Sequence, residues 1–133
     1  MDSAPGIQIV TVQPAYGRRD LAITVTENIL QANPDIDALF ATADAMALGA
    51  LSVVESLSRE KPMILVGFDA CEEAIQAILK GTLQADIAQF PDQMGRMFIE
   101  NALKVVRKEA VPERIPIPVE LVTAENAASF AAQ

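Results

Sequence analysis

Apolar segments with the composition of β-strands alternate along this chain with segments that have the periodicity of helices. The strand-like segments are residues 7–13, 37–42, 63–68, 84–89 and 115–123, and the helix-like segments are residues 20–33, 44–58, 72–80 and 91–108. Strands that alternate with helices of about ten residues or more form βαβ units around a mainly parallel sheet. We therefore predict one α/β domain over residues 1–126, with helices flanking the sheet, and a loose tail over residues 127–133.

Prolines and one glycine mark the boundaries of these segments. Pro14 ends the first predicted strand, and Pro34 ends the first predicted helix because a residue before proline avoids helical geometry. Gly81 is the expected C-cap of the third helix, and Pro91 suits the first turn of the last one. The prolines within residues 115–123 indicate a strand at the sheet edge or at a hinge crossing.

The ionisable residues exclude several classes of function. Ten Lys and Arg residues stand against eighteen Asp and Glu, so a net charge of −8 opposes binding to nucleic acid. The chain has no histidine and one cysteine, Cys71, and therefore lacks the base of a Ser/His/Asp or Cys/His nucleophile system and the ligands of a Cys/His zinc site. Its six glycines form no phosphate-binding motif. We expect no enzyme activity, no cofactor and no metal.

The sequence also bears on the membrane. It has no apolar run of about 18 residues, the length expected of a membrane span. The first ten residues, MDSAPGIQIV, contain neither a basic region nor a long apolar region, so we expect no secretory signal in this chain.

Ligands of open parallel sheets bind outside the carboxyl ends of the strands. In this chain the loops after residues 13, 42, 68 and 89 begin at those ends. They supply two carboxylates, two amides, aromatic rings and, from Arg18 or Arg19, a guanidinium. These groups can hold a polyol, because oxygen and nitrogen atoms bind hydroxyls and rings cover the C–H face of a sugar. The candidate ligand-binding residues are Tyr16, Arg18, Asp44, Phe68, Asp69 and Gln89.

Each candidate also has a structural interpretation. Asp44 and Asp69 can cap the helices that follow them. The aromatic rings can pack in the core or at its rim, the amide can bond within the protein, and the arginine can be a solvated charge. The expected convergence of these side chains at one end of one sheet favours the binding interpretation.

Four strings of residues resemble the ribose-binding protein family, whose members are the sugar-binding components of ABC importers. They are FATADAMALGA at residues 40–50, VGFD at 66–69, AQFPDQMG at 88–95 and VELVTAEN at 119–126. The similarity runs in order from about Ile7 to Asn126. VGFD alone also occurs in LacI-type repressors, and its combination with AQFPDQMG favours the transport proteins.

The resemblance implies two flavodoxin-like lobes, joined by three hinge strands, that clamp a sugar between them. It implies that Asp69 accepts hydrogen bonds from sugar hydroxyls, that Gln89 reaches the sugar from a hinge crossing, and that Phe68 lines the pocket. Tyr16 lies where the family often has an aromatic residue. Ala43 replaces a common asparagine, which argues against simple ribose specificity. The implied setting is the periplasm, or a lipid-anchored extracellular position, with an ABC permease as partner.

The resemblance also implies that this chain is a C-terminal portion. In the family the lobe starts with a strand and a helix that precede the position of Ile7, and that strand is central in the sheet. The whole N-terminal lobe is absent, and residues 91–108 belong to that lobe. A stripe of apolar side chains would then be bare, so we expect a homo-oligomer. The stripe comprises Met94, Phe98, Ala102, Val105 and Val106.

Two alternative functions remain on sequence grounds. One is the effector-binding core of a LacI-type transcriptional regulator, which an upstream helix-turn-helix would distinguish. The other is an enzyme or a signalling domain built on the same fold, because a fold does not fix a function.

Overall fold

The computed structural model describes residues 4–57 and 61–131. Its sheet has four strands in the order β1 (Ala38–Phe40), β2 (Ile64–Val66), β3 (Ala85–Ala88) and β4 (Glu120–Thr123). The first three strands are parallel, and β4 pairs antiparallel to β3. The prediction of a mainly parallel α/β sheet is confirmed.

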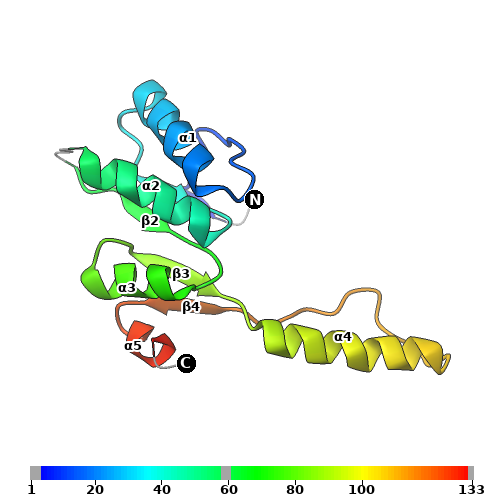
Figure 1. Ribbon diagram of the computed structural model, residues 1–133. Coiled ribbons are helices and arrows are strands. Elements are labelled where there is room, and N and C mark those ends of the chain that lie inside the picture. Colours follow the sequence, from blue (N-terminus) through cyan, green and yellow to red (C-terminus); the bar gives the residue numbers. More distant parts are fainter. Residues whose placement is uncertain (1–3, 58–60, 132–133) are drawn as a thin grey trace.

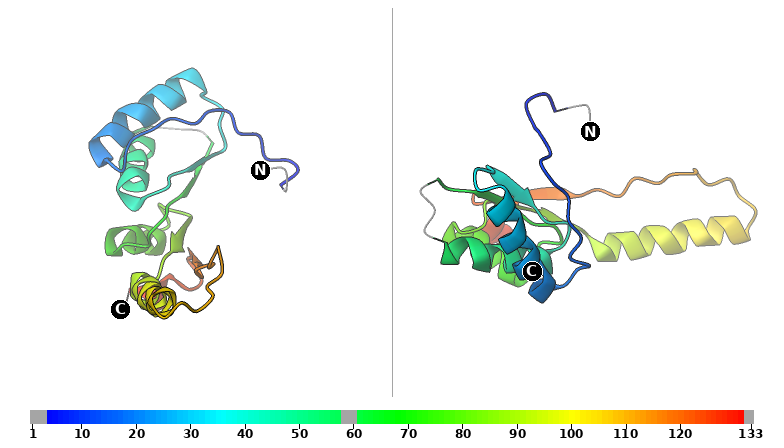
Figure 2. Two further views of the ribbon diagram at one scale, coloured as in Figure 1. Left: turned by 90° about the vertical axis from the view of Figure 1, so that its right-hand side faces the viewer. Right: turned by 90° about the horizontal axis from the view of Figure 1, so that it is seen from above.

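Five helices accompany this sheet in the described residues: α1 (Arg19–Ala32), α2 (Asp44–Ser56), α3 (Glu72–Lys80), α4 (Pro91–Val106) and α5 (Ala127–Phe130). Helix α2 contacts β2, α3 contacts β3, and α1 packs against α2. Helix α4 instead runs away from the sheet, and the chain returns beside it before entering β4 (Figure 1). Helix α4 and the returning chain together form what we call the arm. The views in Figure 2 show this arm from its end and from above.

The core lies between the sheet and helices α2 and α3. Its largest apolar side chains with almost no exposed surface are Leu65, Ile75, Ile78, Leu83 and Val122. Helix α3 ends at Gly81, whose φ of 79° is the left-handed C-cap conformation that the sequence predicted. Helix α3 contributes two of these five side chains, Ile75 and Ile78, and α2 adds Leu48, Leu51 and Val53 to the same core.

The predicted strand over residues 7–13 is wrong. Ile7 and Val12 are 76% and 80% exposed, and no strand of the described residues pairs with this segment. A β-strand is stable only beside another strand. None of the four described strands lies beside this segment, so its β-branched composition does not produce a ladder.

The end of the chain also differs from its prediction. Residues 115–119 are irregular, and only Glu120–Thr123 forms a strand. The first residues of the predicted tail form α5, in which Ala127 is fully buried and which contacts α3. Small alanine side chains allow this turn of helix to approach the core closely. Residues 132–133 of the tail lie outside the described residues, as does residue 58 of the predicted helix 44–58.

Gly49 permits the close packing of α2 on α1. A Cβ atom at Gly49 would lie 2.6 Å from the carbonyl oxygen of Arg19 and 3.0 Å from Cβ of Ala22. We expect Gly49→Ala to lower the free energy of unfolding by about 1–3 kcal/mol, the usual cost of overpacking. Urea denaturation measures this change.

Gly95→Ala is the matched control, because Gly95 also lies inside a helix but has no atom within 4 Å of its Cβ position. Alanine should be neutral there, or stabilising by up to about 1 kcal/mol through helix propensity. Equal destabilisation by both substitutions would contradict the packing explanation.

Candidate functional site

Asp69 and Gln89 meet at the carboxyl ends of two neighbouring parallel strands. Asp69 follows β2 and Gln89 follows β3, and Nε2 of Gln89 donates a hydrogen bond of 2.5 Å to Oδ1 of Asp69. The backbone N–H of Asp69 also donates to the carbonyl of Ile87 at 3.0 Å. The structure therefore brings together the two residues on which the sequence-based site chiefly depends.

The backbone at Asp69 has a conformation that is unusual for a residue with a side chain. Its φ is 120°, and the following Ala70 has a φ of 55°. Positive φ values cost energy in non-glycine residues and persist only where the surroundings impose them. Asp69 itself is exposed, so buried groups that bond the neighbouring residues must help to impose this conformation on the loop of residues 67–71, which we call the Asp69 loop.

Asp44 supplies part of that restraint. The sequence-based prediction that Asp44 binds the ligand is therefore wrong. It is 3% exposed, and its Oδ1 and Oδ2 accept hydrogen bonds from the backbone N–H groups of Phe68 at 3.1 Å and Cys71 at 2.6 Å. The N-cap position of α2 is occupied by Ala43, and Asp44 is the first residue of the helix. Both carboxylate oxygens face the Asp69 loop because α2 begins directly behind it, so a ligand cannot reach them.

Sequence reasoning missed Asp86, the second buried carboxyl of this region. Asp86 lies inside β3 and is fully buried, and its Oδ1 accepts a hydrogen bond of 3.0 Å from the N–H of Ala70. Burial, followed by a hydrogen bond to Asp44 and the charge of Asp44, raises the pKa of Asp86 to about 7. The available signal was a charged residue within an apolar strand pattern, where charges are rarely buried alone.

Phe68 and Tyr16 differ in how close they lie to this loop. Phe68 is half-buried and belongs to the loop itself. Tyr16 is 79% exposed, with a φ of 52°, in the turn before α1. That turn is tied to α2, since the N–H of Gly17 lies 3.3 Å from Sδ of Met46. No hydrogen bond of the described residues joins Tyr16 to Asp69 or Gln89.

Arg18 is engaged with a neighbour in sequence. Its guanidinium forms an ion pair of 2.5 Å with Asp20, and both side chains are largely exposed. The hydrogen bond from Arg18 lowers the pKa of Asp20. No ion pair of the described residues connects Arg18 with Asp69, so the structure does not bring this predicted residue into the Asp69–Gln89 pair.

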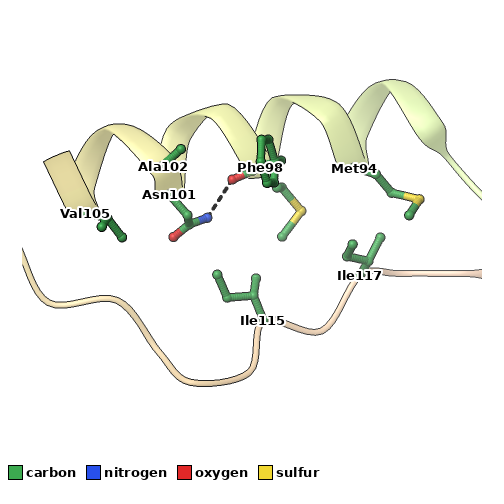
Figure 3. A pocket seen from close by; sticks show the side chains of 8 residues that line it. Met94, Phe98, Asn101, Ala102, Val105, Ile115 and Ile117 are labelled. Carbon is green, nitrogen blue, oxygen red and sulfur yellow. Dashed lines mark hydrogen bonds between the residues drawn. The ribbon is translucent and has the colours of Figure 1, made fainter.

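A hollow lies between α4 and the returning chain (Figure 3). Its lining is apolar apart from Asn101, whose amide donates a hydrogen bond of 2.7 Å to the carbonyl of Met97. The lining residues are Met94, Met97, Phe98, Asn101, Ala102, Val105, Ile115 and Ile117. This chemistry suits an apolar protein surface and not a polyol.

Within the described part of the chain, no three Cys, Asp or Glu side chains are grouped so that they could hold a metal ion. None of the helices formed by residues 4–57 and 61–131 combines the length and the apolar character needed to cross a membrane.

Several known proteins are similar in sequence to this chain over most of its length. The ribose import binding protein of Escherichia coli is 38% identical over 120 residues, which are 90% of this chain and 40% of that protein. A putative rhizopine-binding protein of Rhizobium meliloti is 35% identical over 130 residues, which are 97% of this chain and 42% of that protein. The chain therefore spans about 40% of the length of these relatives. They are binding proteins, which agrees with the prediction that the chain is not an enzyme.

Comparison with solved structures gives the same result. The ABC transporter periplasmic solute binding protein of Actinobacillus succinogenes with bound D-allose aligns with a TM-score of 0.80 and 34% identity, over 94% of this chain and 44% of that one. The Caulobacter myo-inositol binding protein aligns with a TM-score of 0.77 and 33% identity, over 94% and 43%. The family model described as "Periplasmic binding protein domain" matches residues 1–110. The chain belongs to the periplasmic binding protein domain family, as a homologue of its ribose-binding members.

Proposed function

We propose that this chain is the C-terminal sugar-binding portion of the solute-binding component of an ABC importer. The observation that carries the proposal is the direct contact of Asp69 with Gln89 at the carboxyl ends of β2 and β3. Relatives of this chain are named for ribose, D-allose and myo-inositol. These compounds share adjacent hydroxyl groups, and we propose a monosaccharide or a related polyol as the ligand.

The contact leaves hydrogen-bonding capacity for such a ligand. Asp69 keeps its second carboxylate oxygen, and Gln89 keeps one N–H and its carbonyl oxygen. Two neighbouring hydroxyls can donate to the carboxylate while the amide binds a third group. We propose that Phe68, which belongs to the Asp69 loop, offers an aromatic face to the sugar and that Tyr16 closes the exposed side of the site.

We further propose that α4 packs against another lobe in the intact protein. None of the sixteen residues of α4 is buried. Phe98 and Val106 are 71% and 78% exposed, and the apolar hollow of the arm opens beside them. Soluble proteins rarely leave apolar surface of several hundred Å² uncovered. A second lobe would cover it and would place the other half of the clamp over Asp69.

Titration calorimetry of the intact protein with ribose, D-allose, myo-inositol and glucose tests the proposed function. We expect saturable binding of at least one of them. The absence of binding to any sugar of a broad panel would overturn the proposal. A coding sequence upstream that specifies a helix-turn-helix in place of a second lobe would favour the regulator alternative.

We expect the isolated 133-residue chain to self-associate through α4. The exposed stripe supplies the apolar area, and Phe98→Ser removes its largest side chain. Light scattering at micromolar concentration should show an oligomer for the parent chain and a shift towards monomer for Phe98→Ser. Leu79→Ser is the control, because Leu79 is an exposed apolar residue on α3, outside the stripe. A stable, folded monomer of the parent chain would contradict this expectation.

A further inference from the structure

We propose that Asp44 and Asp86 form a carboxyl pair that shares one proton and positions the Asp69 loop for ligand binding. Neither residue is proposed to touch the ligand. Both act through the backbone of residues 67–71, which carries Asp69. The inference rests on the proposed function where sugar affinity is measured, whereas the state of the pair itself can be observed without any ligand.

The hydrogen bonds of the loop show how the pair acts. The N–H groups of residues 67 and 69 donate to backbone carbonyls of Ala85 and Ile87, as in a strand. The N–H groups of residues 68, 70 and 71 turn the other way and donate to carboxylate oxygens. Asp44 accepts two of these bonds and Asp86 accepts one. All five backbone N–H groups are thereby satisfied, and these bonds restrain the stretch in which residues 69 and 70 have positive φ values.

One carboxyl oxygen of the pair shows where a proton belongs. Oδ2 of Asp86 is buried and has no donor within hydrogen-bonding distance. An ionised carboxylate only accepts, so the charged form would leave this buried oxygen unsatisfied. A proton on Asp86 turns the same group into a donor to Asp44, and this is the interaction that contributes to its raised pKa.

Gly67 makes the approach of the two carboxyls possible. A Cβ atom at Gly67 would lie 2.1 Å from Oδ2 of Asp86 and 2.7 Å from Oδ1 of Asp44. Both carboxyl groups therefore lie over the same glycine. Two negative charges held this close to one glycine disfavour each other strongly, and the pair retains a proton.

The surrounding charges do not relieve this repulsion. The described ion pairs join Arg18 to Asp20, Arg19 to Glu73 and Lys61 to Asp37, and none involves the carboxyl pair. Cys71, the other titratable group against it, is neutral because burial raises the pKa of its thiol. Loss of the shared proton therefore leaves two adjacent buried charges and loosens the loop that carries Asp69.

The expected consequence is a sugar affinity that weakens as the pH rises. If only the form with protonated Asp86 holds the loop in its binding conformation, the pKa of about 7 for Asp86 gives about tenfold weaker binding at about pH 8 than at about pH 6. Asp86→Asn keeps an oxygen acceptor for Ala70 and gives Asp44 a permanent N–H donor. Its affinity should stay within about twofold of the parent value at the lower pH and change little with pH.

Two variants show whether the pH dependence arises from the position of the Asp69 loop or from the loss of any one negative charge. Asp35→Asn removes an exposed carboxylate outside the loop, and it should keep the pH dependence of the parent. Asp86→Ala removes the acceptor for Ala70 as well as the proton, and should bind weakly at both pH values. A pH dependence of sugar affinity that survives Asp86→Asn unchanged would overturn the proposal.

NMR of the 133-residue chain tests the pair without a ligand. The side-chain carboxyl carbon of Asp86 and the backbone amides of residues 68, 70 and 71 should titrate together with a midpoint near 7, and Asp86→Asn should abolish this transition of the amides. A midpoint near 4 would overturn the inference even if the protein binds sugar. Conversely, failure to bind any sugar would refute the proposed function while the NMR result still decides the pair.

Discussion

Asp69→Ala should abolish measurable sugar binding by the intact protein. The substitution removes the carboxylate proposed to accept hydrogen bonds from two hydroxyls, and it leaves Gln89 without its partner. Hydrogen bonds to a charged group contribute about 1.5–3 kcal/mol each. Losing two of them should therefore raise Kd by about 100-fold or more. Titration calorimetry with the best sugar of the panel measures the loss.

Asp69→Gly provides a control that separates binding from folding. The φ of 120° at this position suits glycine, so the substitution relieves backbone strain while it removes the same carboxylate. Because glycine also makes the unfolded chain more flexible, the free energy of unfolding should change by no more than about 1 kcal/mol. Sugar affinity should fall as far as in Asp69→Ala. Retention of near-parental affinity by either variant would exclude Asp69 from the site.

The elements that depend on local sequence were predictable. Helices α2, α3 and α4 begin at the predicted residues 44, 72 and 91, because proline, glycine and apolar periodicity act within a few residues of one another. The proximity of Asp69 and Gln89 was predictable as well. It requires only that both follow strands which lie side by side in a parallel sheet.

The features that depend on distant contacts were not predictable. Residues 7–13 have the composition of a strand, yet a strand also requires a neighbour, and composition does not reveal its absence. The place of Asp44 at a helix start predicts a cap or a ligand contact, whereas its actual partners are backbone N–H groups 24 and 27 residues away. Asp86 was hidden by the same limitation, because the burial of its carboxyl depends on how the Asp69 loop folds over β3.

The free energy of unfolding should fall as the pH rises from about 4 to about 7, the reverse of the usual behaviour of carboxylates. Asp86 titrates at about 7 in the folded protein, against an ordinary value of 3.8. Between these two values the folded state holds a proton that the unfolded state has released. Stability then decreases with increasing pH until the folded form also loses the proton. The difference between the two pKa values corresponds to a few kcal/mol, about 4 at most.

Urea denaturation of the 133-residue chain at about pH 5 and about pH 8 measures this decrease. The range avoids the other shifted groups: the lowered pKa values of Asp20 and Asp37 act at more acidic pH, and the raised pKa of Cys71 acts at more alkaline pH. Asp86→Asn should remove the decrease, because its amide donates to Asp44 at every pH. A parent chain that is as stable at the higher pH as at the lower one would show that Asp86 is ionised in the folded state, and a buried oxygen without a donor would then have to be tolerated at the centre of the loop.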